Sequence, residues 1–499
     1  MADATQSRLG SAASWIAKEL GLHTMYTAGK DVYTIILARY LRMYAYGSVA
    51  LVLALYFRAQ GLSDAQIGFF MTLTLLGDVV VSLLLTLVAD RLGRRTTLML
   101  GALGMSVSGA VFATSTSYPA LLTAAVVGVV SPSGNEIGPF RAVEESTLAG
   151  LVGEEGRADV FTWYVAFAVL GTSTGLIVGG QAVDALSARH DWTELDAYRA
   201  VFWVYTAVGL VKALLTFFLS RACEQHTPPS KPVPSEGETE PLLPAADDAS
   251  HPVATSNGDA EVAERSKKSW NPIASISPAS RAILFKLCSL FFLDSLGSGM
   301  VPFSLINYYL DRKFSLPKGK LGAIMSATWF LSTFGNIFSA SLARRLGLIP
   351  AMVATHLPSS LFLAALPAAP QLPLTIALLV GRSTMSSMDQ APRSAFLSMV
   401  VLPEERTAVM GVVNTLKILS QSAGPWITGV LAGGGRFWVA FVVAGGLKAC
   451  YDVLLLGMFG ARGWARKPGG VAGESRGGSG VRDEEGNDGQ RGGVAASTG

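Results

Sequence analysis

The feature that most constrains the fold of this chain is a long internal repeat. The stretch EEGRADVFTWYVAFAVLGTSTGLIVGG around Arg157 returns as EERTAVMGVVNTLKILSQSAGPWITG around Arg406, an offset of 249 residues between positions 157 and 406. The same offset joins Gly175 to Gly424. Solenoid repeats span about 20–50 residues, so this period is too long for one. It fits two related helical bundles embedded in a membrane, with any site expected at their interface.

The composition indicates lipid rather than water as the solvent. Hydrophobic residues make up 50% of the chain, charged residues 15%, and the mean hydropathy is +0.41, whereas soluble domains carry about 25% charged residues. The formal net charge of +3 is too small to imply a nucleic-acid partner. Cys223, Cys288 and Cys450 lie in or beside apolar segments without metal-ligand spacing. We therefore expect reduced thiols, no metal site and no cofactor.

Apolar segments of about 20 residues, the length that crosses about 30 Å of hydrocarbon, recur along the chain. Six are predicted in each half, in agreement with the repeat. They lie at about 34–57, 66–89, 97–116, 119–146, 158–181, 200–220, 282–309, 319–342, 349–369, 372–400, 406–431 and 437–459. The predicted fold class is an all-α membrane protein with twelve transmembrane helices in two pseudo-symmetric six-helix bundles.

Two long segments are interrupted by prolines, which break helical hydrogen bonding. They are 119–146, with Pro132 and Pro139, and 372–400, with Pro392. We expect both helices to kink, which a membrane tolerates only where protein or a cavity satisfies the freed backbone groups.

Two stretches are too polar to cross a membrane. Residues 222–278 are rich in Pro, Ser, Glu and Asp, and the tail from 461 is rich in Gly, so neither buries enough apolar surface to fold. We divide the chain into a cytoplasmic N-terminal tail, an N-terminal six-helix bundle, a disordered cytoplasmic linker, a C-terminal six-helix bundle and a disordered cytoplasmic tail. The boundaries are 1–30, 31–221, 222–278, 279–460 and 461–499.

Basic residues near the predicted helix ends set the expected orientation, because cytoplasmic loops carry an excess of Lys and Arg. With an even number of spans, both termini lie on the same side of the membrane. The basic residues lie on that side as well: Arg91, Arg94, Arg95, Lys267, Lys268, Arg281, Arg344 and Arg345. We expect a multi-pass protein of the cell membrane. The linker run ETEPLL at 238–243 resembles an acidic dileucine sorting signal, which leaves a vacuolar or endosomal membrane as the alternative.

The run ADRLGRR at 89–95 resembles the G-x-x-x-D-R/K-x-G-R-R/K signature that the major facilitator superfamily carries between helices 2 and 3. Thr86 stands in place of the leading glycine. The matching residues are Asp90, Arg91, Gly93, Arg94 and Arg95. The resemblance covers the whole membrane part of the chain and implies a transporter fold without specifying a substrate.

A second motif, GTSTGLIVGG, is similar to the family's G-x-x-x-G-P-x-x-G-G motif, which is associated with proton antiporters. Leu176 replaces the proline, and the matches are Gly171, Gly175, Gly179 and Gly180. The paired segment in the second half keeps Gly424, Pro425 and Gly429. Glycines four residues apart form a ridge on which another helix can pack closely. A gating role and ordinary helix packing are both open interpretations.

The loop after the second segment is a candidate gate as well as an anchor for its arginines. The Asp90 carboxylate could bind a facing helix terminus or an arginine and hold one conformation closed. We expect its partner to be the start of the eleventh segment, near Glu405 and Arg406, so that the lock forms on the cytoplasmic side.

Ionisable side chains at mid-depth in a membrane cost about 3 kcal/mol and are functional candidates by default. In the family that this chain resembles, helices 1, 4, 7 and 10 line the central cavity, and most intramembrane charges here lie on those segments. The candidates for substrate binding or proton coupling are Arg42, Asp78, Glu136, Arg141, Asp294, Arg382 and Asp389. Lys212 and Lys448 occupy matching places in the repeat, which favours a shared architectural role.

Spacing separates these candidates. Arg382 and Asp389 are seven residues apart, so they share a helix face and are expected to bracket a substrate. Arg141 lies three and four residues before Glu144 and Glu145, which leaves a structural ion pair as the alternative for these residues.

Asp294 and Glu136 have no obvious partner nearby in the sequence. A desolvated carboxylate can carry a proton through a conformational cycle, and we expect one of the two to do so. The alternative is a fixed ion pair with Arg42, Lys212 or Lys448. Asp78, whose repeat position holds Ser332, is the secondary proton candidate.

The sequence predicts a secondary active transporter that moves a small polar or charged solute by alternating access. Protons are the expected coupling ion, and the antiporter-like motif favours efflux. An organic anion held by Arg42 and Arg382 is the substrate class that the mixed charges favour. No nucleotide-binding loop and no nucleophile–base pair occurs in the sequence, so we do not expect an enzyme.

Two alternatives stay open. One is proton-coupled uptake of an organic acid or nutrient; the other, of a different class, is a non-transporting membrane sensor of the same fold. The expected partners are a small-molecule substrate, protons and the lipid bilayer, with the chain as a monomer and without nucleic acid.

Overall fold

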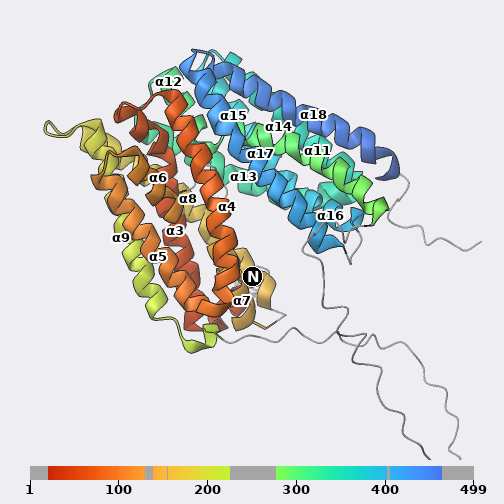
Figure 1. Cartoon of the computed structure of the whole chain (residues 1–499), viewed down its shortest axis with the longest axis horizontal. Helices are drawn as coiled ribbons and strands as arrows, with labels where there is room; N and C mark the ends of the chain where they lie inside the picture. Colours follow the sequence, from red (N-terminus) through yellow and green to blue (C-terminus); the bar gives the residue numbers. More distant parts are fainter. Residues whose placement is uncertain are drawn as a thin grey trace, which may run out of the picture.

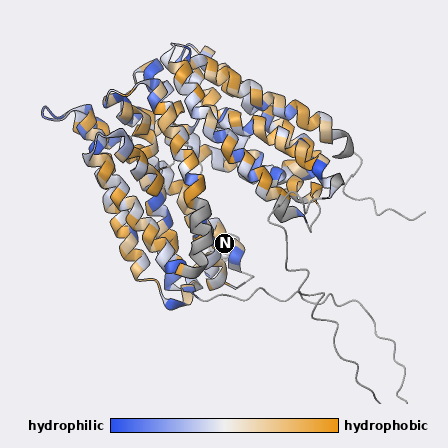
Figure 2. Ribbon diagram, viewed as in Figure 1, coloured by the Kyte–Doolittle hydropathy of each residue, from blue (hydrophilic) through white to orange (hydrophobic). Residues whose placement is uncertain are grey.

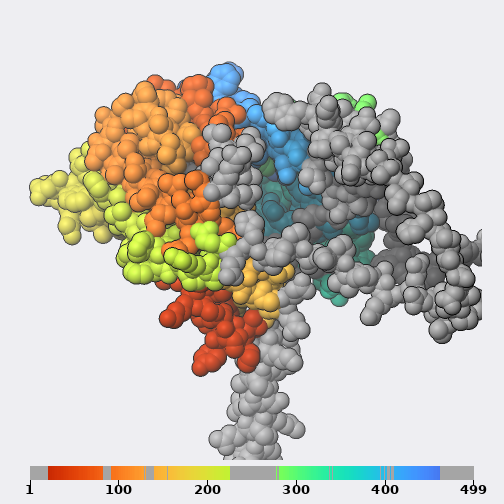
Figure 3. All heavy atoms as spheres, turned by 60° about the horizontal axis from the view of Figure 1, so that its bottom comes forward, coloured from red at the N-terminus to blue at the C-terminus, as the bar shows by residue number. Residues whose placement is uncertain are grey.

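The structure, a computed structural model, describes residues 21–128, 130, 139–153, 156–224, 277–401 and 405–463. The described residues form helices and the segments that join them, with no strand among them. They separate into a first bundle before the linker and a second bundle after it (Figure 1). The two bundles still lie side by side when the molecule is turned by 60° (Figure 3).

The helices of the first bundle follow one another through short connections. They are α2 (Leu22–Thr27), α3 (Lys30–Ala59), α4 (Asp64–Leu92), α5 (Arg94–Thr114), α6 (Tyr118–Val127), α7 (Pro139–Leu151), α8 (Arg157–Ser187), α9 (Glu194–Phe217) and the 3-10 turn η2 (Arg221–Glu224).

The second bundle follows the same plan. Its helices are α11 (Pro278–Met300), α12 (Phe303–Phe314), α13 (Lys318–Leu346), α14 (Leu348–Ala365), the 3-10 turn η3 (Leu366–Ala368), α15 (Leu372–Met388), α16 (Gln390–Val400), α17 (Arg406–Gly433) and α18 (Phe437–Gly463). Each predicted segment coincides with one described helix or with two consecutive ones. The largest differences are six residues, at 181 against Ser187 and at 200 against Glu194.

The sequence repeat is visible in the backbone. A glycine with positive φ separates α4 from α5 and α13 from α14: Gly93 at 85° and Gly347 at 88°. Side chains with a Cβ rarely adopt this conformation. The two glycines are 254 residues apart, the difference between 93 and 347, so the same sharp turn joins the second and third spans of each bundle.

Three spans are broken rather than continuous. The predicted segment 119–146 contains α6 and α7, with 129 and 131–138, and therefore Pro132, outside the described residues. The segment 372–400 breaks at Asp389, three residues before Pro392. The segment 282–309 also breaks, at Val301 and Pro302, which the sequence analysis did not anticipate. Pro302 has no N–H to continue the helical ladder and is instead the N-cap of α12.

The outer surface is suited to lipid. Eight of the described helices are long and apolar enough to cross a membrane. Apolar residues cover both bundles (Figure 2), and large ones such as Phe218, Phe285 and Trp438 are more than half exposed. Surface of this kind is stable when acyl chains rather than water cover it.

We refer to the end of each bundle that carries the linker connections at Glu224 and Ser277 as the linker side, and to the opposite end as the far side. The ribbons of the two bundles converge at the far side and diverge towards the linker side (Figure 1). A Cβ on Gly68 of α4 would lie 2.3 Å from the Pro425 carbonyl oxygen of α17. One on Gly322 of α13 would lie 2.2 Å from the Leu176 carbonyl oxygen of α8. Glycine at these positions lets the two bundles meet backbone to backbone.

Candidate functional site

The first bundle buries one carboxylate among three cations. Glu144 on α7 is 1% exposed and accepts hydrogen bonds from Arg42 on α3 (2.7 Å) and from the Tyr164 hydroxyl on α8 (2.8 Å). Arg39 lies 3.9 Å and Lys212 on α9 lies 3.4 Å from the same carboxylate. These five residues form what we term the Glu144 cluster. It connects four helices in the linker half of the bundle.

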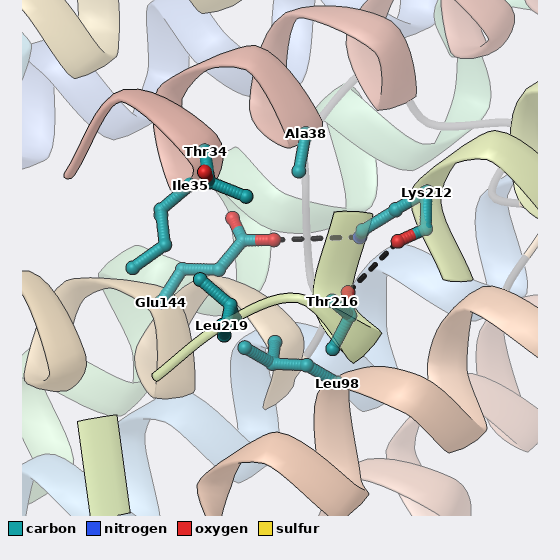
Figure 4. A pocket seen from close by; sticks show the side chains of 8 residues that line it. All are labelled: Thr34, Ile35, Ala38, Leu98, Glu144, Lys212, Thr216 and Leu219. Atoms are coloured by element: carbon teal, nitrogen blue, oxygen red, sulfur yellow. Dashed lines mark hydrogen bonds and ion pairs between the residues drawn. The ribbon is translucent and has the colours of Figure 1, made fainter. Parts of the chain in front are cut away.

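A small pocket lies beside this cluster (Figure 4). Glu144 and Lys212 point towards each other across one wall, while Ile35, Leu98 and Leu219 supply apolar side chains around them. Because these apolar neighbours keep water away, the Coulomb attraction inside the cluster is much stronger than it would be in water.

The second bundle places three carboxylates, two permanent cations and one imidazole in mutual contact. We refer to these as the Asp294 cluster: Asp294 on α11, His356 on α14, Asp389 between α15 and α16, Arg393 on α16, and Lys448 and Asp452 on α18. Asp294 accepts hydrogen bonds from Lys448 (2.8 Å) and Arg393 (2.7 Å). Arg393 also pairs with Asp389, four residues earlier. The cluster therefore joins α11, α16 and α18 through one carboxylate.

His356 lies between two carboxylates of this cluster. Its Nδ1 is 3.0 Å from both carboxylate oxygens of Asp452, and its Nε2 is 3.5 Å from Oδ1 of Asp294. Asp452 is 0% exposed and also lies 3.5 Å from the Ser360 hydroxyl. The ring packs edge-on against Tyr451, with centroids 5.5 Å apart. This imidazole is therefore part of the charged cluster as well as of the core.

The two clusters occupy related positions in the repeat. The offset of 249 that joins Arg157 to Arg406 also joins Glu144 to Arg393, the difference between 144 and 393. Lys212 and Lys448 hold the matching places on α9 and α18. The acid at the centre of the first cluster is thus replaced by a base in the second, whereas the matching lysines keep their sign.

Three intramembrane charges lack an ion-pair partner within the described residues: Asp78, Arg382 and Lys417, the last of which lies over the Phe291 ring at 5.2 Å. Both carboxylate oxygens of Asp78 on α4, a residue that is 2% exposed, have no hydrogen-bond partner there. Arg382 on α15 accepts a hydrogen bond from Ser359 at its carbonyl oxygen, but no described carboxylate pairs with its guanidinium. Asp78 and Arg382 are therefore, with Lys417, charges whose counterions the described chain does not supply.

The structure places the other predicted site residues as follows. Arg141 pairs with Glu145 at 2.6 Å on a partly exposed face, as the structural alternative stated. Asp389 pairs with Arg393 and lies at the break between α15 and α16, and its bracketing of a substrate together with Arg382 stays a prediction. Glu136 lies outside the described residues.

Sequence reasoning missed several members of the Asp294 cluster. Arg393, Asp452 and His356 were not among the predicted site residues. The repeat offset from Glu144 pointed to Arg393. Nothing in the spacing pointed to Asp452, because its contact with His356 spans 96 residues of sequence.

The glycine motifs pack both within and between bundles: Gly180 lies against Lys318 and Gly429 against Asp64 of the other bundle, while the remaining glycines lie against helices of their own bundle. A Cβ on Gly171 or Gly175 would lie 2.5 or 2.0 Å from the carbonyl oxygens of Tyr40 and Tyr44 on α3, and one on Gly179 3.0 Å from Ser48 of α3. Gly424 likewise meets α11 within the second bundle, whereas the Pro425 carbonyl reaches across to the first.

The predicted linker-side gate is described only in part. The side chains of Asp90 and Arg91 lie outside the described residues. Beyond Gly93, the backbone N–H groups of Arg94 and Arg95 donate to the Glu224 carboxylate at 3.0 and 3.1 Å. Glu405, the expected partner region, accepts a hydrogen bond from the Ser277 N–H at 2.9 Å. The described contacts of these two segments thus stay inside their own bundles.

At the far side, two carboxylates join the bundles. Asp64 at the start of α4 accepts hydrogen bonds from the Tyr308 hydroxyl (2.6 Å) and from Arg312 (2.7 Å), both on α12. Asp184 on α8 accepts the backbone N–H groups of Lys318 and Gly319, each at 2.7 Å, at the start of α13. We name Asp64 and Asp184 with these partners the far-side lock. The sequence analysis did not identify either acid.

The arrangement of two pseudo-symmetric helical bundles with apolar outer surfaces is that of a multi-pass membrane transport protein. The family model described as Major Facilitator Superfamily matches residues 35–285 and 287–481. The chain belongs to this superfamily. The resemblance stated from the sequence and the predicted two-bundle, all-helical fold class are thereby confirmed.

A curated relative and several solved structures are similar to the chain. The uncharacterized membrane protein YJR124C of Saccharomyces cerevisiae is 33% identical over 443 residues, 87% of this chain and 94% of that protein. The nucleoside transporter NupG aligns with a TM-score of 0.62 at 14% identity, over 86% of this chain and 99% of that one.

Two further structures are similar in fold. The xylose transporter XylE from E. coli, in an inward open conformation, has a TM-score of 0.60 at 13% identity, over 85% of this chain and 95% of that one. The human organic anion transporter MFSD10 has a TM-score of 0.53 at 17% identity, over 85% and 98%. At these identities the solved structures establish the fold and leave the substrate open.

Proposed function

We propose that this protein is a secondary active transporter that moves a small organic anion by alternating access, with protons as the coupling ion. Arg382 carries the proposal. It lies ten residues beyond Leu372, the start of its span, and therefore about 15 Å into the membrane. A cation at this depth costs about 3 kcal/mol or more without a counterion. A substrate anion would supply the negative charge that the described chain lacks here.

Asp78 is the residue that we propose for proton coupling in the first bundle. It lies at the middle of α4, with neither carboxylate oxygen bonded within the described residues. A buried carboxylate without a partner is costly while it is charged, so binding a proton removes that cost. Glu136 stays a prediction of the same kind, outside the described residues. Asp294, held by two permanent cations, is better suited to a fixed counterion.

The far-side lock supports alternating access. Both of its carboxylates bridge the two bundles, so breaking them is a requirement for the far side to open. We propose that this structure corresponds to the state open towards the linker side, which the distribution of basic residues assigns to the cytoplasm. The antiporter-like glycine motif favours efflux as the direction of transport.

Purified protein in proteoliposomes with an imposed pH gradient tests the proposal. A panel of radiolabelled monocarboxylates, dicarboxylates, neutral sugars and organic cations would be offered in turn. The expected result is gradient-dependent movement of an anion that Arg382→Gln abolishes and that Arg345→Gln, a change at an exposed position on the linker side, leaves intact. Movement confined to neutral or cationic solutes, or movement indifferent to the pH gradient, contradicts the proposal.

A further inference from the structure

The most informative unassigned group in the molecule is the imidazole of His356. Both of its ring nitrogens face carboxylate oxygens: Nδ1 faces Asp452 at 3.0 Å and Nε2 faces Asp294 at 3.5 Å. A neutral imidazole has one donor and one acceptor, whereas an imidazolium has two donors. If the neutral ring donates from Nδ1 to Asp452, its Nε2 lone pair points at a second acceptor. The doubly protonated ring alone donates in both directions.

Asp452 supplies an independent reason for a proton at this place. It is 0% exposed, and the polar partners of its side chain among the described residues are the His356 ring and the Ser360 hydroxyl. No permanent cation of the described chain lies within ion-pair distance of it. A buried carboxylate without a cation is strongly unfavourable, and a proton shared with the imidazole neutralises it.

Other charged groups on α11, α15, α16, α17 and α18 surround this pair. Asp294 and Asp389 favour an added proton, while cations on α15, α16, α17 and α18 oppose it: Arg382, Arg393, Lys417 and Lys448. Tyr451 covers one edge of the ring. Lys448 and Arg393 are already engaged by Asp294 and Asp389, so they neutralise those acids first. The opposing charges make the added proton exchangeable rather than permanent.

We propose that His356 and Asp452 together bind one exchangeable proton in the second bundle. On binding, the proton bonds to Nε2 of His356, and the pair changes from a net charge of minus one to neutral. On release, the proton passes from Nε2 to water. Asp294, clamped by two cations, positions the ring and does not itself carry the proton. This site rests on the proton-coupled transport proposed above and names a carrier for it.

Water can reach the cluster from the side of Arg393. The Arg393 side chain is 17% exposed, whereas those of Asp294, His356 and Asp452 are 6%, 3% and 0% exposed. Exposure thus decreases along the chain of contacts from Arg393 through Asp294 to His356 and Asp452. The proton site lies at the innermost end of that chain.

Nitrogen NMR of the purified full-length protein in lipid nanodiscs tests the site directly. The chain has five histidines, and His356→Gln identifies the buried ring by the loss of its signals. We expect both nitrogens of His356 to become protonated as the pH falls. Asp452→Asn should lower the midpoint of that titration by about one pH unit or more, because the carboxylate that stabilises the imidazolium is lost.

The control is His190→Gln, which removes an exposed histidine and should leave the His356 titration unchanged. If His356→Gln does not fold, replacing the other four histidines together leaves His356 as the only labelled ring. A His356 signal that stays neutral from pH 4 to pH 9, or a midpoint that Asp452→Asn does not move, overturns the site.

Transport measurements separate this site from the proposed function. Loss of pH-gradient-driven accumulation in Asp452→Asn, with substrate exchange retained, supports the site as the coupling carrier. Unimpaired gradient-driven accumulation in that variant overturns the site and leaves proton-coupled transport standing. A wild-type protein that ignores the pH gradient overturns the coupling itself, whatever the NMR titration gives.

Discussion

In the first bundle a single carboxylate, Glu144, faces two arginines and a lysine. In the second bundle an arginine at the matching position of the repeat, Arg393, faces acids: Asp294 and Asp389 share two permanent cations, and Asp452 pairs with His356. The repeat thus keeps positions at which the helices of a bundle bring charges together, and it keeps the lysine, while the sign at positions 144 and 393 is reversed. In the Glu144 cluster the cations are in excess and one acid holds them together. In the Asp294 cluster the acids are in excess, which is the condition for the proton binding that we propose there.

The largest effect is expected from removing the acid at the centre of the first cluster. Glu144→Gln leaves three cations close together without their carboxylate, which should cost about 3–5 kcal/mol of folding free energy, the scale for breaking a buried ion pair. Thermal unfolding of the purified protein and its yield in membranes measure this. Glu145→Gln, next in sequence and partly exposed, should cost less than about 1 kcal/mol. Equal losses in the two variants would contradict a central role for Glu144.

A smaller effect, of opposite sign in the two bundles, is expected from the matched lysines. Lys448→Met removes a cation where acids are in excess and should destabilise the protein by about 2–3 kcal/mol. Lys212→Met removes one where cations are in excess and should be close to neutral or stabilising. Comparing the two melting temperatures tests the charge balance without altering either acid. Similar destabilisation by both substitutions would show that the lysines act by packing and not by charge.

A third effect separates contacts inside bundles from contacts between them. Asp64→Asn or Asp184→Asn weakens the far-side lock by about 1–3 kcal/mol, the scale of a hydrogen bond to a charged group. This should shift the conformational population while leaving the melting temperature nearly unchanged. Spin labels on exposed Ser117 of the first bundle and Gln371 of the second should then report longer far-side distances.

A control variant accompanies the experiment on the far-side lock. Asp191→Asn, on an exposed far-side segment of the first bundle, should leave the distance distribution as in the wild type. Unchanged distances in both lock variants would mean that backbone contacts at Gly68 and Gly322, and not the carboxylates, hold the far side together.

The smallest effect lies at the linker side of the second bundle. Hydrogen bonds from Ser280 and Ser277 lower the pKa of Glu405 below its usual value. Its contribution to folding is therefore present above the unfolded value, near pH 4, and is lost as the pH falls through the lowered native value. The first bundle has Gly156 at the matching position, so the effect belongs to the second. Melting curves of Glu405→Gln and wild type should differ at pH 7 and converge towards pH 3; a constant difference would exclude titration of Glu405 as its source.

The positions of the spans could be predicted from the sequence because the burial of apolar side chains in lipid dominates the free energy of these segments. A stretch of apolar residues long enough to cross the bilayer is much more stable as a helix in lipid than exposed to water. The repeat then indicated the same number of spans in each half. The break at Pro302 could not be read from the proline alone, because Pro358 and Pro425 lie inside the continuous helices α14 and α17. The segment was interpreted as one continuous span because its apolar stretch is long enough to cross the bilayer.

The pairing of charges could not be predicted in the same way. Asp294 meets Lys448 across 154 residues and His356 meets Asp452 across 96, and such contacts depend on the rotation of each helix about its axis. Sequence spacing gives only contacts within one helix, such as Arg141 with Glu145. Asp64 and Asp184 lie at helix ends, where charged residues are common and carry no signal of a partner in the other bundle.

The depth of His356 has an electrical consequence. It lies eight residues from Leu348 and nine from Ala365, at the middle of α14. A proton bound there from either face has crossed about half of the membrane potential. Because a whole elementary charge moved through 100 mV is worth about 2.3 kcal/mol, half of that drop changes the apparent proton affinity roughly sevenfold per 100 mV. The membrane voltage would then change the proton affinity of this site in each half of the cycle, although it supplies no net driving force when the substrate charge cancels that of the proton.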